Sequence, residues 1–136
     1  MPIKPTFFAI CEDVRLEING RITIVGLFDT LTLPAIPGGA NLCVTTRWCA
    51  SGPVTATVSL HMLTPDSPAP IQLIDQRIEL QDPEGLGFCS AGTVAKFAWQ
   101  FHTQGLHYIQ VRLDGERIGE LPLMVRRHTH RKGCPR

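Results

Sequence analysis

Apolar and polar residues alternate one by one along most of this chain, and this pattern constrains the fold more than any other feature. In the clearest stretch the apolar positions are Val54, Ala56, Val58, Leu60 and Met62. The same period of two recurs in residues 42–48, 93–101 and 107–113. Successive side chains of a β-strand point to opposite faces, so this period is typical of strands with one buried face. No stretch of 11 residues keeps the helical spacing of apolar residues without an interrupting proline or glycine.

Two dipeptides, Asn19-Gly20 and Asp114-Gly115, separate stretches that have the strand pattern. Both are typical of two-residue hairpin turns with positive φ at both central positions. Loops rich in proline or glycine interrupt the chain again at residues 34–39, 65–70 and 82–85. Together these signals predict an all-β fold, a two-layer antiparallel β-sandwich of eight or nine strands, Ig-like or jelly-roll-like.

The expected core is built from the apolar faces of these strands, namely Val58, Leu60, Ile78, Phe97, Trp99, Ile109 and Val111. Trp48 also falls on the apolar side of its strand. The apolar parity changes at Gly26 and near Gly119, which predicts a β-bulge at each place. Pro122 has no N–H, so its strand is expected at a sheet edge or with the missing donor on an open side. One short helical turn is expected near residues 83–88.

At 136 residues the chain has the length of one domain. Its charge is divided unevenly. Residues 1–125 carry eight Lys or Arg and twelve Asp or Glu, whereas residues 126–136 carry five Lys or Arg and no acid. We therefore expect a β-sandwich domain over residues 1–125 and a basic, flexible tail over residues 126–136. An acidic body repels nucleic acid, so DNA or RNA is expected to bind, if at all, only through the tail.

The chain contains five cysteines: Cys11, Cys43, Cys49, Cys89 and Cys134. The number is odd, no CxxC pair occurs, and the first ten residues contain no secretory apolar segment. These features favour a cytoplasmic protein with reduced thiols. Cys11, Cys43 and Cys89 lie in strand-like stretches, so structural thiols are favoured over metal-binding or redox-active ones. No apolar run approaches the roughly 18 residues of a membrane span.

The chain contains no phosphate-binding loop, no HExxH and no GxSxG pattern. Cys89-Ser90 comes nearest to a nucleophile, but it lacks the glycine two positions before the serine. His128, His130 and Cys134 have metal-ligating atoms, yet they lie in the basic tail, whose charge opposes a divalent cation. We therefore expect no catalytic residue, no cofactor, no metal site and no enzymatic activity.

The candidate partner-binding residues are Tyr108, Arg126, Arg127, Arg131 and Lys132. Tyr108 lies on the polar side of its strand pattern and is the best aromatic candidate for the surface. The four basic residues could make an electrostatic contact with an acidic partner. No aromatic residue lies among them, so base stacking is not indicated.

Four segments in fixed order resemble a known family: residues 5–12 (PTFFAICE), 24–31 (IVGLFDTL), 44–48 (VTTRW) and 114–125 (DGERIGELPLMV). Together they resemble an uncharacterised bacterial single-domain β-protein family, a domain of unknown function, over about residues 4–125. The resemblance implies a bacterial, cytoplasmic β-domain and assigns no activity or catalytic residue.

Three classes of function remain open. The first is a non-enzymatic binding or accessory module whose partner is another protein, and it is favoured because loops on a β-scaffold can present a recognition surface. The second is a structural subunit that forms a homo-oligomer through its sheet edges. The third is a small hydrolase or metal-dependent enzyme that uses Cys and His from loops.

Overall fold

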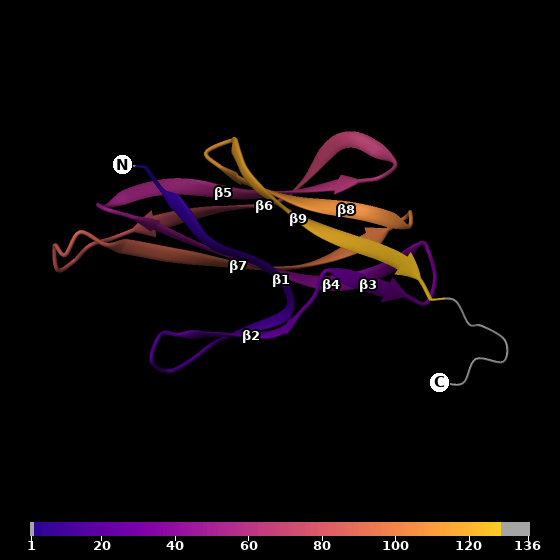
Figure 1. Cartoon of the computed structure of the whole chain (residues 1–136), viewed down its shortest axis with the longest axis horizontal. Coiled ribbons are helices and arrows are strands. Elements are labelled where there is room, and N and C mark those ends of the chain that lie inside the picture. The colour runs from indigo at the N-terminus through magenta and orange to yellow at the C-terminus, as the bar shows by residue number, and fades with distance from the viewer. Residues whose placement is uncertain (1, 129–136) are drawn as a thin grey trace.

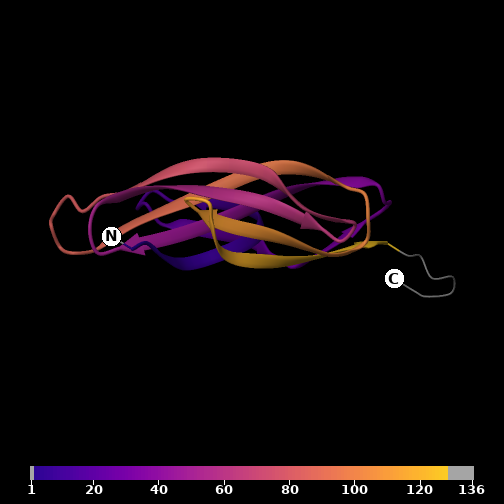
Figure 2. The same ribbon diagram turned by 90° about the horizontal axis from the view of Figure 1, so that it is seen from above.

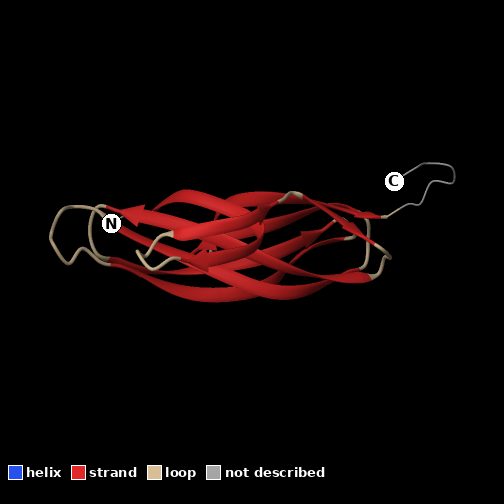
Figure 3. Cartoon of the chain, turned by 90° about the horizontal axis from the view of Figure 1, so that it is seen from below, coloured by secondary structure: helices blue, strands red, loops and turns tan. Residues whose placement is uncertain are grey.

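The computed structural model describes residues 2–128, and within these residues it contains strands and no helix (Figures 1 and 3). The nine strands are β1 (Lys4–Leu16), β2 (Ile22–Leu27), β3 (Thr30–Leu33), β4 (Gly38–Ala50), β5 (Val54–Thr64), β6 (Ser67–Leu80), β7 (Cys89–Phe101), β8 (Gly105–Leu113) and β9 (Glu116–Arg127). One sheet has the order β2-β1-β4-β7 and the other β3-β9-β8-β5-β6. The strands of both sheets run along the long axis of the molecule (Figure 2). The predicted β-sandwich is therefore confirmed.

All strand pairs are antiparallel except β3 and β9, which are parallel. This pair departs from the purely antiparallel sandwich expected from the sequence. It arises because the chain crosses from the four-stranded sheet to the five-stranded sheet between β2 and β3. After this crossing β3 runs beside the last four residues of β9 in the same direction. No hairpin joins these two strands, so nothing requires them to be antiparallel.

The core lies between the two sheets and is built from their inward-facing apolar side chains. Five of the seven predicted core residues are buried: Val58, Leu60, Ile78, Ile109 and Val111. Phe97 and Trp99 are only half-buried and pack at the margin of the core, so for them the prediction was too strong. Trp48 is completely buried, as expected. Its Nε1 donates to Thr46 Oγ1 (2.8 Å), which satisfies the indole without exposing it.

The two glycine turns differ from each other. Asp114 and Gly115 both have positive φ, 49° and 83°, as a two-residue hairpin turn requires. In the other hairpin Gly20 has φ 81°, but Asn19 is not among the residues with positive φ. Gly20 N–H donates to Glu17 O (3.0 Å) and Glu17 N–H to Arg21 O (2.7 Å). This loop therefore has three residues, a turn followed by a left-handed glycine, and the predicted two-residue turn was wrong.

The two predicted bulges also have different outcomes. The β8–β9 register shifts after Val111, which leaves Ile118 beside Gly119 as the extra residue, so this bulge is confirmed. The β1–β2 register is the same on both sides of Gly26, so no residue is inserted there. Gly26 instead adopts φ 67°, and a Cβ on it would lie 2.6 Å from Glu12 Cδ. With the register unshifted, Leu27 lies on the opposite face of β2 from Ile22 and Ile24 and is exposed, so the change of apolar parity needs no bulge.

The helical turn expected near residues 83–88 is absent, and a loop held by Asp82 takes its place. The carboxylate of Asp82 accepts hydrogen bonds from Leu86 N–H (2.9 Å) and Gly87 N–H (2.8 Å). Gly85 and Gly87 have positive φ. These conformations stop a right-handed helix from forming.

The last strand continues past residue 125, the predicted end of the domain, so the boundary expected there is too early. Arg126 and Arg127 pair with Thr32 and Leu33 of β3. His128 N–H then donates to Leu33 O (2.6 Å). Residues 129–136, the remainder of the expected tail, lie outside the described residues.

The turn at Asp114 provides a stability test. Asp114 Oδ1 accepts a hydrogen bond from Thr57 N–H, and Asp114 N–H donates to Thr57 O, both at 2.9 Å. Asp114→Ala removes the carboxylate and places alanine at positive φ, so we expect the free energy of unfolding to fall by about 1–2 kcal/mol. Asp114→Asn keeps an oxygen acceptor and tolerates the left-handed conformation, so its loss should be at most half as large. Urea unfolding measures both, and equal losses would contradict this role of the carboxylate.

Candidate functional site

Two strands, one in each sheet, have a second neighbouring strand along half of their length or less. β2 pairs with Cys11–Leu16, so the first half of β1 has a neighbouring strand on the β4 side alone. β3 pairs with the last four residues of β9, so the earlier part of β9 has only β8 beside it. These two half-open strands approach each other along one side of the sandwich (Figure 1).

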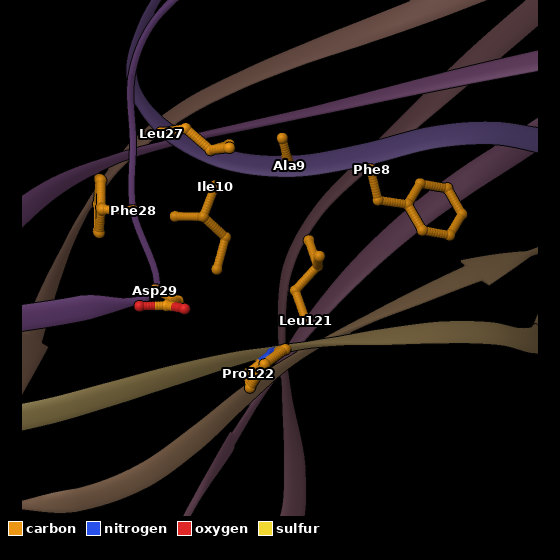
Figure 4. A pocket seen from close by; sticks show the side chains of 8 residues that line it. All are labelled: Phe8, Ala9, Ile10, Leu27, Phe28, Asp29, Leu121 and Pro122. Atoms are coloured by element: carbon orange, nitrogen blue, oxygen red, sulfur yellow. The ribbon is translucent and has the colours of Figure 1, made fainter.

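An apolar hollow of about 340 Å³ lies between these strands, and we call it the β1–β9 cleft. Its lining residues are Phe8, Ala9, Ile10, Leu27, Phe28, Asp29, Leu121 and Pro122. Ile10 and Leu121 point towards each other from opposite sides of the cleft (Figure 4). Asp29 is the one charged residue in the lining. The cleft is therefore an apolar site with a single carboxylate in its wall.

Both ends of the cleft are held by contacts between the two sheets. At one end Phe8 packs against Gly119, where an added Cβ would lie 3.1 Å from Phe8 Cε2. At the other end Phe28 N–H donates to Ile10 O (3.1 Å), and Met124 N–H donates to Asp29 O (2.8 Å). The cleft is a bounded pit rather than a channel between the sheets.

The backbone beside the pit differs between its two walls. Ile10 O points towards the β2 side of β1, so the N–H and C=O of Phe8, two residues earlier, point the same way. Among the described residues no strand pairs with β1 at that position. On the opposite wall Met124 N–H points towards β3, so the nitrogen of Pro122 also faces the open side, where it has no hydrogen to donate. This confirms the prediction that Pro122 places its missing donor on an open side. Of these two walls, in the part of the chain that the structure describes, only β1 offers both an N–H donor and a C=O acceptor beside the pit.

The sequence-predicted partner residues lie near this site only in part. Tyr108 is half-buried, and it pairs with Pro122 of β9, a residue that lines the cleft. Arg126 Nε donates to Thr32 Oγ1 of β3 (3.0 Å), and Arg127 N–H donates to Gln104 Oε1 just before β8 (2.8 Å). Both arginines are therefore held at the end of β9 by neighbouring segments. Arg131 and Lys132 lie outside the described residues. The cleft residues were missed, although the brevity of residues 22–27 and 30–33 could have indicated an incomplete edge.

The alternative chemical sites are not assembled in the described part of the chain. Cys89 is buried, and burial raises the pKa of its thiol, whereas a nucleophile needs a lowered pKa. Ser90 is exposed and pairs with Cys49. Within residues 2–128 no three His, Cys, Asp or Glu side chains gather as a metal site. His130 and Cys134, which the sequence does not favour as metal ligands together with His128, lie outside the described residues. No helix of residues 2–128 is long and apolar enough to cross a membrane.

These strands and sheets define a small β-sandwich domain. The chain belongs to a family of unknown function (DUF6941), which matches residues 6–126. This match confirms the resemblance to an uncharacterised domain. No curated protein matches the chain in sequence.

Several solved structures contain a similar fold. One is the Pseudomonas fluorescens alkylpurine DNA glycosylase AlkC bound to DNA with an abasic-site analogue, with TM-score 0.54 and 16% identity, over 91% of this chain and 30% of that one. Another is the Listeria innocua β-glucosidase, with TM-score 0.51 and 11% identity, over 92% of this chain and 16% of that one. The chain thus spans less than a third of either enzyme, and at these identities the similarity shows the fold alone.

Proposed function

We propose that this chain is a non-enzymatic protein-binding module of the bacterial cytoplasm. Its partner lays an extended segment along the open edge of β1 and inserts an apolar side chain into the β1–β9 cleft. The observation that carries this proposal is the coincidence of an apolar pit with an unpaired strand edge beside it. Strand addition of this kind obtains affinity from main-chain hydrogen bonds and specificity from pockets for alternate side chains.

The size and lining of the cleft support a peptide anchor over a larger ligand. A volume of about 340 Å³ lies near the lower end of the roughly 300–1,000 Å³ usual for ligand pockets. It suits one or two apolar side chains. Asp29 favours a lysine or arginine next to the anchor, because opposite charges attract across the rim. We therefore expect a partner segment with an apolar residue flanked by a basic one.

Leu27 permits a test with little risk to the fold. Its side chain lines the cleft yet is 68% exposed. Peptides of extended conformation are selected from a displayed library against the whole chain, and their affinity is measured by fluorescence anisotropy. Leu27→Ser should weaken binding roughly five- to tenfold, since it removes about 1 kcal/mol of apolar contact. Leu16→Ser is the matched control, because Leu16 lies on the same hairpin, outside the cleft, and is 78% exposed.

Amide exchange locates the bound segment independently of substitutions. A peptide that adds to β1 should slow exchange of the Phe8 amide, whose N–H points to the open side of the strand. Equal losses in Leu27→Ser and Leu16→Ser, together with unchanged exchange at Phe8, would rule out this site. A complex whose mass shows two copies and no peptide would instead favour a subunit that assembles through its own sheet edges.

A further inference from the structure

Two cysteines lie directly opposite each other on neighbouring strands. Cys11 of β1 and Cys43 of β4 are partners in the antiparallel register. Their chain neighbours Ile10, Leu42 and Val44 belong to the main core, so both cysteines face the other side of the four-stranded sheet. There they form a separate small apolar cluster with Val14. Both thiols are free and buried.

The backbone geometry of this pair meets the requirements of a disulfide. Because Ile10 O bonds on the β2 side, the backbone groups of Cys11 point towards β4, and the two cysteines form a hydrogen-bonded pair. Such pairs have Cα atoms about 5.5 Å apart. Disulfides span Cα separations of about 4.4–6.8 Å, with a mode near this value. Cys11 Sγ lies 3.7 Å from Cys43 O, so this thiol already reaches the opposite strand.

The surroundings of the pair provide access from one side. Cys43 lines a hollow of about 400 Å³ together with Lys96. Lys96 Nζ is 2.7 Å from Asp13 Oδ1, and these two side chains are 60% and 39% exposed. Burial raises the pKa of Cys43, while the charge of Lys96 acts in the opposite direction. Burial, reinforced by Cys43, raises the pKa of Cys11 to about 11. Cys43, which lines this hollow, is therefore the cysteine that a reagent entering from solvent meets first.

We propose that Cys11 and Cys43 are a redox-active dithiol, which a low-molecular-weight disulfide such as oxidised glutathione converts into an intramolecular disulfide. The disulfide joins β1 to β4 at Cys11, the residue that follows Ile10, and Ile10 lines the β1–β9 cleft. This inference goes beyond the proposed binding function and does not depend on it.

The reaction proceeds by two thiol–disulfide exchanges. The Cys43 thiolate attacks one sulfur of oxidised glutathione, and the S–S bond breaks to release one glutathione thiolate. The Cys11 thiolate then attacks the Cys43 sulfur of the mixed disulfide and displaces the second glutathione. The protein loses two protons and two electrons, and one molecule of oxidised glutathione becomes two of reduced glutathione.

The test uses the full chain, reduced and then incubated at pH 8 in glutathione buffers of graded ratio. Remaining thiols are blocked with iodoacetamide, and the digest is analysed by mass spectrometry without reduction. We expect a peptide pair linked through Cys11 and Cys43, with Cys89 alkylated after denaturation. A bridge between residues 32 positions apart removes freedom from the unfolded chain, so Tm should rise on the order of 10 °C and fall back with dithiothreitol.

Two variants make the assignment specific. Cys43→Ala should abolish the rise in Tm, and Cys89→Ala, which removes another buried thiol, should retain it. The proposal is overturned if Cys11 and Cys43 are both recovered alkylated while other cysteines carry glutathione. A linked pair that includes any other cysteine overturns it as well. The peptide mass from the unmodified chain decides the matter even where a variant fails to fold.

Discussion

Trp48→Ala is expected to lower the free energy of unfolding by about 3–5 kcal/mol, the usual cost of truncating a buried tryptophan. The indole is completely buried, and its ring lies 5.3 Å from that of Phe8 in a tilted contact. The substitution leaves a cavity and removes the donor to Thr46 Oγ1. Domains of this size are stable by only about 5–15 kcal/mol, so a loss of this size is a substantial share of the total.

Trp99→Ala is the matched control, since it removes the same side chain from a half-buried position. We expect a loss no more than half that of Trp48→Ala, measured by urea unfolding with a common m-value. The loss of free energy in Trp48→Phe should lie between those of the two alanine variants, because phenylalanine keeps an aromatic ring but has no indole N–H. If the two alanine variants lose the same free energy, Trp48 is not the centre of the core.

The contrast between these tryptophans shows what the alternation pattern encodes. Both lie on the apolar parity of their strands, and parity reports which face of a sheet a side chain occupies. It does not report how near the strand lies to the margin of the sandwich. Trp48 is on β4, an interior strand, whereas Trp99 is on β7, one of the two edge strands of the same sheet. How deeply a side chain is buried depends on the position of its strand in the sheet, and only pairing between distant parts of the chain decides that position.

The short strands could have indicated an incomplete edge, but the lining of the β1–β9 cleft could not be predicted from the sequence, for the same reason. Its walls come from residues near 8, 28 and 121, and no local pattern joins them. The pit exists because β2 and β3 stop short of covering β1 and β9. The extension of β9 to Arg126 and Arg127 was not predicted, for another reason. Arg126 and Arg127 pair with β3 through their backbones, and backbone pairing needs no apolar side chain.

Stability is also expected to fall at alkaline pH because of Cys11. This thiol is completely buried, and its burial, with a contribution from Cys43, raises its pKa from 9.0 to about 11. The charged or titratable groups near it are Cys43, Asp13 and Lys96. The unfolded thiol loses its proton as the pH passes 9.0, while the folded thiol keeps its proton up to about 11. The folded state therefore binds more protons in this range.

The sign of the effect follows from this difference in bound protons. The contribution of the Cys11 thiol to the free energy of unfolding is fully present below pH 9 and is lost progressively as the pH rises towards 11. A shift of this size corresponds to roughly 2–3 kcal/mol once both states are ionised. Urea unfolding at pH 8, 9, 10 and 10.5, with a phosphine reductant present, measures the slope.

Cys11→Ala lowers stability at every pH through its smaller side chain, yet it should flatten the decline above pH 9, because the buried thiol is gone. Lysine and tyrosine titrate in the same range in both proteins, so only the difference between their slopes reports on Cys11. Parallel slopes would show that the thiol ionises in the folded sheet as readily as in the unfolded chain.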